Sequence, residues 1–110
     1  MLKGQEMFKG TTPTFTFTTS ANIDLTQATG VYVTFSNINE TQIFTKTGAD
    51  LVINEKSIEV FLTQQETLLF PEGTVKVQIN WTYNEDGKVK RCASEKMTIN
   101  AIRNLINEVL

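Results

Sequence analysis

The sequence predicts an all-β fold, an antiparallel β-sandwich of about seven strands that forms one domain. The chain has 110 residues, of which 40% are hydrophobic and 20% are charged, as is usual for a single globular domain. Several short runs alternate apolar with polar residues, which is the period of a strand with one buried face. Turn-forming residues separate these runs at the spacing typical of a sandwich.

Residues 75–83 give the clearest strand signal in the chain. Every second side chain is apolar or aromatic: Val75, Val77, Ile79, Trp81 and Tyr83. This period predicts a central strand with one face on the core. The Asp86-Gly87 pair can adopt the positive φ angles of a tight hairpin turn, so residues 88–99 are expected to return as a second long strand.

Five shorter β-rich runs complete the predicted sandwich. They are residues 14–18, 31–35, 42–46, 51–53 and 57–62. Pro13 precedes the first run, where its missing N–H is tolerated in a first or edge strand. After the last run, Thr63 and Glu66 have the spacing of a helix-capping box, and residues 71–73 stop a helix. We therefore expect a single helical turn that crosses from one sheet to the other.

The C-terminal segment, residues 100–110, is predicted to be a short amphipathic helix. Its apolar residues recur on one helix face: Ile102, Leu105, Ile106 and Val109. Asn100 has the side chain of an N-cap. A helix this short needs a surface to pack on.

The N-terminal residues 1–12 have no sustained period and contain Gly4 and Gly10. We expect an arm there that orders against a partner. The predicted organisation is one domain with an arm (1–12), a sandwich (13–99) and a C-terminal helix (100–110).

Charge and hydropathy argue against several classes of partner. The net charge is -2, from 10 Lys and Arg against 12 Asp and Glu, so we expect no nucleic-acid partner. No apolar run is long enough for a membrane span or a signal peptide, so no membrane partner is expected either. Cys92 is the single cysteine, which suits folding without a disulfide in a reducing cytoplasm.

Catalytic motifs are missing from the sequence. The chain contains no histidine, so Cys92 has no imidazole to activate it as a nucleophile. The carboxylates are scattered over predicted turns, without metal-ligand spacing, and the glycines form no phosphate-binding motif. We therefore expect a protein that is not an enzyme and that has no cofactor or metal.

The aromatic and basic residues allow two interpretations each. Trp81 and Tyr83 could form a sugar-stacking platform, but their position on the apolar strand face favours burial in the core. Tyr32 lies on the opposite face from its apolar neighbours and is the better candidate for an exposed contact residue. The basic run 88–91 either guards a strand edge against unwanted pairing or binds an anion, and its alternation favours the guard.

Four segments, residues 10–18, 31–35, 62–70 and 75–79, carry a resemblance in their order and spacing. They resemble small structural proteins of tailed bacteriophages and prophages of Gram-positive bacteria. That family is similar to the N-terminal domain of phage baseplate upper protein, which has an immunoglobulin-like fold. The resemblance runs from Gly10 to the C-terminus. It implies an immunoglobulin-like sandwich that is made in the bacterial host cytoplasm and becomes part of a virion.

Our first hypothesis is a non-enzymatic virion structural protein, such as a head-fibre, decoration, baseplate or tail component. Its partners would be capsid or baseplate and tail subunits, and copies of the same chain in a homo-oligomer. The expected contact residues are Met7, Phe8, Tyr32, Ile102, Leu105, Ile106 and Val109. In the alternative arrangement, the C-terminal helix folds back onto its own sandwich.

A second hypothesis, from another class, is a carbohydrate-binding module that recognises the host surface. It predicts solvent-exposed aromatic side chains in a line or a groove. Burial of Trp81 in the core would argue against it. An enzyme or enzyme-inhibitor domain is a third possibility, for which the sequence offers no motif.

Overall fold

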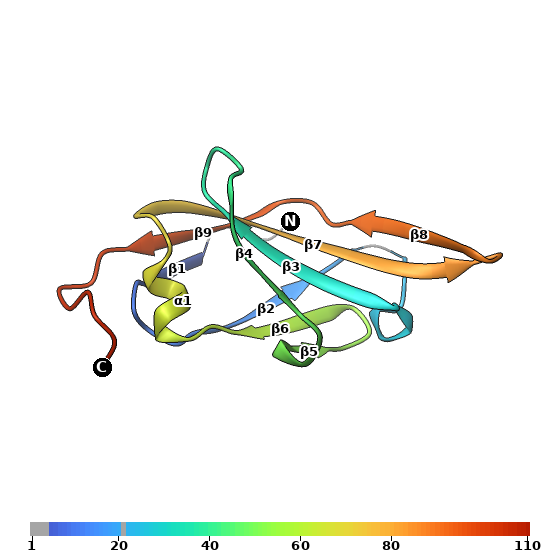
Figure 1. The fold of residues 1–110 in the computed structure, drawn as a ribbon, viewed down its shortest axis with the longest axis horizontal. Coiled ribbons are helices and arrows are strands. Elements are labelled where there is room, and N and C mark those ends of the chain that lie inside the picture. Colours follow the sequence, from blue (N-terminus) through green and yellow to red (C-terminus); the bar gives the residue numbers. More distant parts are fainter. Residues whose placement is uncertain (1–4, 21) are drawn as a thin grey trace.

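The computed structural model describes residues 5–20 and 22–110, which form two β-sheets packed face to face (Figure 1). The larger, mixed sheet contains β1 (Gln5–Phe8), β3 (Gly30–Ser36), β4 (Gln42–Thr47), β7 (Gly73–Glu85), β8 (Lys88–Ala93) and β9 (Met97–Ile102). The smaller, antiparallel sheet contains β2 (Thr14–Thr18), β5 (Leu51–Ile53) and β6 (Ser57–Phe61). The predicted all-β sandwich is confirmed.

The strand order is β1-β9-β7-β3-β4 in the larger sheet, where β8 also pairs with β7, and β2-β6-β5 in the smaller sheet. A short helix, α1 (Gln64–Leu68), connects β6 of one sheet to β7 of the other. Two 3-10 turns lie at Leu25–Gln27 and Gly48–Asp50. In the described part of the chain, no helix is long and apolar enough to cross a membrane.

The core forms where the inward faces of both sheets meet, as the two-residue period predicts. Phe15 and Phe17 of β2 are buried, and so are Val75, Val77, Ile79 and Trp81 of β7. Each such side chain contributes about 1.5–3 kcal/mol when it leaves water. The aromatic rings of Phe35, Phe44 and Phe70 also pack together, with centroids 5.0 to 5.7 Å apart. The Phe17 ring of β2 lies 6.5 Å from the Phe35 ring of β3, so this aromatic cluster joins the two sheets.

Two local predictions hold in detail. The β7–β8 hairpin turns at Asp86 and Gly87, whose φ angles are 52° and 74°. In α1, the Thr63 side chain accepts a hydrogen bond from the backbone of Glu66, and the Glu66 carboxylate accepts one from the backbone of Thr63. The predicted capping box is thus confirmed, and it sets the start of α1.

Glu66 has a second partner that the sequence did not suggest. The Nζ atom of Lys46, on the inner face of β4, donates to both carboxylate oxygens of Glu66 at 2.9 and 2.8 Å. Burial alone would raise the pKa of Glu66, but the hydrogen bonds from Lys46 and from the Thr63 backbone outweigh it and hold that pKa below its ordinary value. This ion pair ties α1 to the edge strand of the larger sheet.

The described residues form nine strands rather than about seven. One reason is that the predicted strand 88–99 is divided into β8 and β9. Between the pairs Asn80–Ala93 and Val77–Met97, the returning strand has three residues and β7 has two. The extra residue forms a β-bulge around Ser94, whose Oγ accepts from the backbone N–H of Ile79 at 3.0 Å.

The other added strand is β1, which corrects the prediction of an N-terminal arm. Residues 5–8 pair in parallel with β9, from Gln5 opposite Ile99 to Phe8 opposite Ile102. Residues 1–4 of the predicted arm lie outside the described residues. A strand forms here because Glu6, Met7 and Phe8 alternate between the two faces and the edge of β9 supplies hydrogen-bonding partners.

The predicted C-terminal helix, residues 100–110, is wrong. Asn100 and Ile102 continue β9, because Met97, Ile99 and Ala101 alternate into the core with the period of a strand. The tail 103–110 then forms bends without a helix. The Asn104 Oδ1 accepts from the backbone N–H of Ile106 at 3.2 Å, a local bond that competes with helix formation.

Candidate functional site

The predicted contact residues divide between three places. Met7 is only 6% exposed and belongs to the core, so its prediction as a contact residue is wrong. Its side chain is buried because β1 joins the sheet with that face turned inward. Tyr32 lies on the outer face of the larger sheet. The remaining five residues gather at one end of the sandwich, which we call the terminal surface: Phe8, Ile102, Leu105, Ile106 and Val109.

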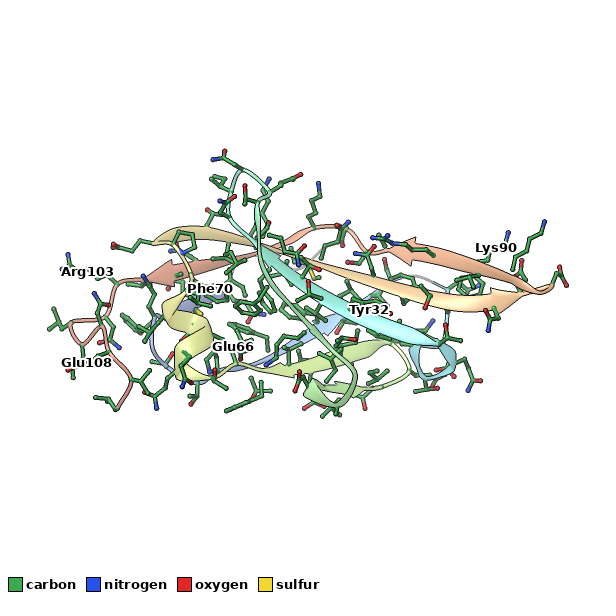
Figure 2. All side chains as sticks on the ribbon, in the orientation of Figure 1. Tyr32, Glu66, Phe70, Lys90, Arg103 and Glu108 are labelled. Atoms are coloured by element: carbon green, nitrogen blue, oxygen red, sulfur yellow. The ribbon has the colours of Figure 1, made fainter. Side chains whose placement is uncertain are left out.

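The terminal surface is apolar and open to solvent. Leu105 is 100% exposed, and Phe8, Ile106 and Val109 are each about half exposed. Phe8 lies opposite Ile102 in the β1–β9 register, so the two side chains share the outer face. Figure 2 shows Arg103 and Glu108 of the tail at this end of the molecule, away from Tyr32. The structure therefore joins apolar residues from both terminal regions of the chain.

Side-chain amides hold the tail in place. Asn104 Nδ2 donates to the backbone oxygen of Lys9 at 3.1 Å. Further along, the Oε1 atom of Gln64 in α1 accepts from the backbone N–H of Leu110 at 2.7 Å. Leu110 is 84% exposed and extends the terminal surface. The sequence contained no signal for these contacts, because each joins segments that lie far apart in the chain.

A buried hydroxyl connects α1 to the segment after β1. Thr67 is fully buried, and its Oγ1 donates to the backbone oxygen of Thr11 at 2.8 Å. The same atom accepts from the backbone N–H of Gly10 at 2.9 Å. A Cβ on Gly10 would lie 3.3 Å from a methyl carbon of Leu68, and the φ of Gly10 is +81°, so a glycine suits this close approach. α1 is therefore the support of the terminal surface.

The second surface is a polar groove on the outer face of the larger sheet, which we call the outer groove. It consists of two adjoining hollows of about 310 and 360 Å³. Thr34, Asn80 and Arg91 line both hollows, while Tyr32 lines one of them. Most of the lining comes from β3 and β7, whose backbones are paired on both sides. The groove floor is consequently rigid.

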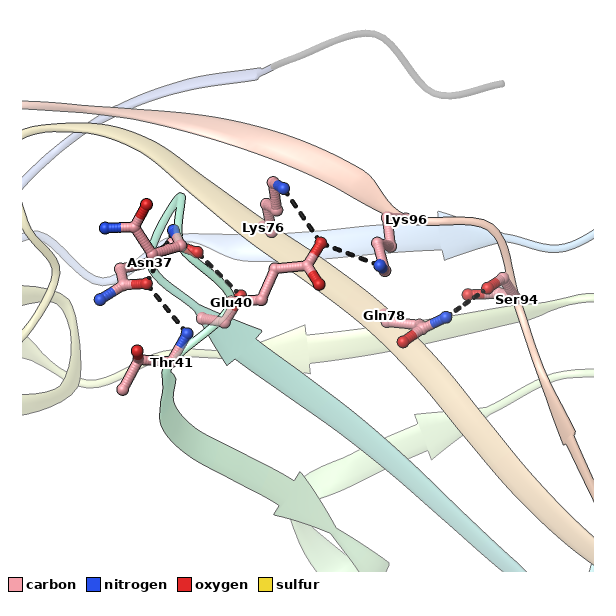
Figure 3. Close-up of polar contacts among 9 residues, drawn as sticks. Asn37, Glu40, Thr41, Lys76, Gln78, Ser94 and Lys96 are labelled. Carbon is pink, nitrogen blue, oxygen red and sulfur yellow. Dashed lines mark hydrogen bonds and ion pairs between the residues drawn. The ribbon is translucent and has the colours of Figure 1, made fainter.

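One end of the outer groove is closed by the β3–β4 hairpin, which rises above the sheet (Figures 1 and 3). Glu40 in this hairpin reaches back over the sheet, and its Oε2 contacts Lys96 Nζ at 2.8 Å and Lys76 Nζ at 3.0 Å. The hydrogen bonds from Lys96 and then Lys76 hold the pKa of the Glu40 carboxyl below its ordinary value. We call this ion-paired end of the groove the Glu40 wall. One of its lysines, Lys96, belongs to the three-residue stretch that forms the β-bulge between β8 and β9.

The backbone of Glu40 is itself unusual, with a φ of 65°, which is uncommon for a residue other than glycine. The Asn37 Oδ1 stabilises the turn by accepting from the backbone N–H groups of Asn39 and Thr41, at 2.9 and 3.0 Å (Figure 3). The hairpin is therefore built so that Glu40 points at the two lysines.

Trp81 offers no surface for a ligand. It is 2% exposed, in agreement with the expected core position. Tyr83 lies at the margin of the core, where the neighbouring Cys92 thiol raises the pKa of the Tyr83 phenol. Lys88 and Lys90 lie on β8, which pairs only with β7 among the described residues, so the basic run follows a sheet edge.

Within residues 5–20 and 22–110, no three His, Cys, Asp or Glu side chains come together as metal ligands would. No family model matches the chain, and no curated protein matches it.

Proposed function

We propose that this chain is a non-enzymatic structural module with an immunoglobulin-like sandwich, and that it works through protein–protein assembly. The strand order supports the fold proposal. Strands β2, β6 and β5 correspond to B, E and D of an immunoglobulin domain, and β9, β7, β3 and β4 correspond to G, F, C and C′. The helix α1 occupies the crossover between E and F.

The terminal surface is the observation that carries the assembly proposal. Exposed apolar side chains scattered singly over a protein need no explanation, but a group of them points to an interaction. Here the exposed Phe8, Leu105, Ile106 and Val109 lie at one end with the half-buried Ile102, on a strand edge and a tail that few hydrogen bonds hold. A partner that covers them would remove this apolar area from water.

The partner class follows from the resemblance of the strand segments to phage structural proteins. We propose that the module is a head-fibre, decoration, baseplate or tail component, and that its partners are capsid, baseplate or tail subunits together with copies of the chain. It would be made in the host cytoplasm and act in the virion. This part of the proposal depends on the resemblance, whereas the assembly role depends on the terminal surface.

The carbohydrate-binding alternative loses its first candidate residues, because the core position of Trp81 removes a Trp81–Tyr83 platform. A sugar ligand would have to use another surface, and Tyr32 is the exposed aromatic residue on the outer groove.

Light scattering of the full chain over a range of concentrations tests self-assembly. The variant Phe8→Ser/Leu105→Ser removes apolar surface from the terminal surface. The matched control Val52→Ser/Val89→Ser removes two exposed apolar side chains, 57% and 73% exposed, from other places. We expect the wild type and the control to be oligomeric and the terminal variant to be a folded monomer.

The same three proteins can be mixed with disrupted particles of the phage class named above, and binding to capsid, baseplate and tail subunits can be scored. Loss of both self-association and subunit binding in the terminal variant alone supports the proposal. If the terminal variant and the control behave alike in both assays, assembly through the terminal surface is wrong.

A further inference from the structure

We propose that the outer groove binds an acidic oligosaccharide, with Tyr32 stacking on a sugar ring and Arg91 pairing with a carboxylate of the ligand. This inference goes beyond the assembly function, because it uses a different surface and a different class of ligand. Four observations on the described residues carry it: the placement of Tyr32, the charge balance, the chemistry of the lining and its rigidity.

Tyr32 is placed by a glycine. A Cβ on Gly30 would lie 2.8 Å from the Tyr32 Oη and 3.2 Å from its Cε2, so the outer half of the ring occupies the space above Gly30. The backbone of Gly30 is not in the left-handed region, and a residue with a side chain could adopt its conformation. The glycine therefore makes room for the ring, which follows the sheet and remains 40% exposed.

An aromatic ring held in this position suits a sugar. The C–H groups on one side of a pyranose ring are weakly positive, and they pack against the negative face of an aromatic ring. Tyrosine adds a hydroxyl that can bond to the hydroxyls of the sugar. Tyr32 also lies at one end of the groove, opposite the Glu40 wall, so a ligand that stacks there can extend along the floor.

The charges of the groove favour an anion. Lys76 and Lys96 share the single carboxylate of Glu40. The Nε of Arg91 donates to the Asn80 Oδ1 at 3.1 Å, and its other two guanidinium nitrogens have no polar partner among the described residues. Three cations therefore face one carboxylate, and Arg91 is exposed with a free edge. Such an edge binds a carboxylate through two parallel hydrogen bonds.

The remaining lining matches hydroxyl-rich ligands better than proteins or nucleic acids. Thr34, Gln78 and Asn80 present hydroxyl and amide groups to the groove. A protein partner usually needs a buried apolar anchor, but the one aliphatic residue among those that line the two hollows is Val77, whose side chain is buried in the core. A nucleic acid needs several uncompensated cations, whereas two of the three here share a carboxylate.

The polar side chains are also held in position before any ligand binds. The hydroxyls of Thr34 and Thr45 are 3.0 Å apart, and Gln78 Nε2 donates to the backbone oxygen of Ser94 at 2.9 Å. Asn80 is fixed by its bond to Arg91. Groups that are already ordered lose little conformational entropy on binding, so a shallow groove can still bind a ligand specifically.

The test is a titration of the full chain, followed by backbone NMR. The acidic probes are tetragalacturonate, a hyaluronate tetrasaccharide and sialyllactose, and the comparison probes are neutral maltotetraose and a twelve-nucleotide DNA strand. We expect saturable binding of at least one acidic probe, with shift changes confined to β3, β7 and β8. We expect maltotetraose and the DNA strand to bind at least tenfold more weakly.

Three variants identify the groove. Arg91→Gln and Tyr32→Ala should each weaken binding about tenfold or more, because a charge-assisted pair or a stacking surface is lost. Gly30→Ala should weaken binding through displacement of the Tyr32 ring, with the NMR spectrum of the core unchanged. Lys88→Gln, which removes an exposed cation from the same strand as Arg91, is the control and should bind as the wild type does.

Absence of binding to all three acidic probes would overturn the proposal. So would equal losses in Arg91→Gln and Lys88→Gln, which would indicate general charge attraction, or equal binding of the DNA strand. Equal binding of maltotetraose would reject the role of Arg91. The Phe8→Ser/Leu105→Ser variant should bind the sugar normally, so failure here and failure of the assembly proposal can be distinguished.

Discussion

The terminal surface and the outer groove differ in their polarity and in how firmly the elements that form them are hydrogen-bonded. The terminal surface is apolar and consists of an edge strand and a tail that a few side-chain amides attach. The outer groove is polar and lies on strands β3 and β7, which are paired on both sides. The first surface can adapt to a partner, and the second presents fixed groups. The two proposed functions, apolar attachment and polar recognition, thus use separate parts of one small sandwich.

The largest expected difference in the free energy of unfolding is between substitutions on the two faces of β1. Met7→Ala should lower the free energy of unfolding by about 2–4 kcal/mol, because Met7 is buried in the core. Phe8→Ala should change it by less than about 1 kcal/mol, because Phe8 is 53% exposed. Urea denaturation of the two variants measures the difference. Similar losses for both would mean that Phe8 belongs to the core rather than to the terminal surface.

A smaller effect is expected where α1 meets β4. Glu66→Gln retains a capping side chain but removes the charge opposite Lys46, and it should lower stability by about 1–2 kcal/mol at pH 7. The folded pKa of Glu66 lies below its ordinary value of 4.5, so the stabilisation is present above that value and is lost as the pH falls through the folded pKa.

The gap in urea midpoint between the wild type and Glu66→Gln should therefore close in acid. Glu108→Gln is the control. Glu108 is exposed in the tail, so the urea midpoint of this variant should equal that of the wild type at both pH 7 and pH 3. A gap that persists unchanged at pH 3 would show that the amide disturbs the capping box rather than the ion pair.

The smallest effect is expected at the wall of the outer groove. Glu40→Gln should leave the unfolding midpoint nearly unchanged, since the carboxylate is exposed, but it should increase the mobility of residues 37–41. Backbone NMR relaxation measures that mobility. Because the folded pKa of Glu40 is lowered, the same increase should appear in the wild type as the pH falls below 4.5.

The control for the wall is Glu85→Gln in the other long hairpin, which should leave residues 37–41 unaffected. An unchanged hairpin in Glu40→Gln would mean that the bonds of Asn37 alone hold the wall.

The sequence predicted the elements whose signals are local. The alternation of residues 75–83, the Asp86-Gly87 turn and the Thr63–Glu66 capping box each lie within a few residues, and each is present in the structure. Long-range pairing was the part that could not be predicted. The strand β1 has only four residues, and its partner β9 follows at the other end of the chain.

The errors at the C-terminus have the same origin. Ile102, Leu105, Ile106 and Val109 do fit a helical face, but the competing alternation that leads to Ala101 is satisfied by pairing with β1 and β7. For the outer groove, the sequence suggested Tyr32 and, as the less favoured interpretation of the run 88–91, an anion site that includes Arg91. The role proposed for Arg91 depends on the β7–β8 register, which places it beside Asn80, and on the bulge that follows.

The parallel pairing of β1 with β9 has a mechanical consequence. In this arrangement the chain enters β1 at one end of the paired segment and leaves β9 at the other. A force that pulls on these two points acts along the strands, so the hydrogen bonds between them are sheared together instead of opening one after another. A sandwich closed in this way resists stretching along its length before any of its core is exposed to water.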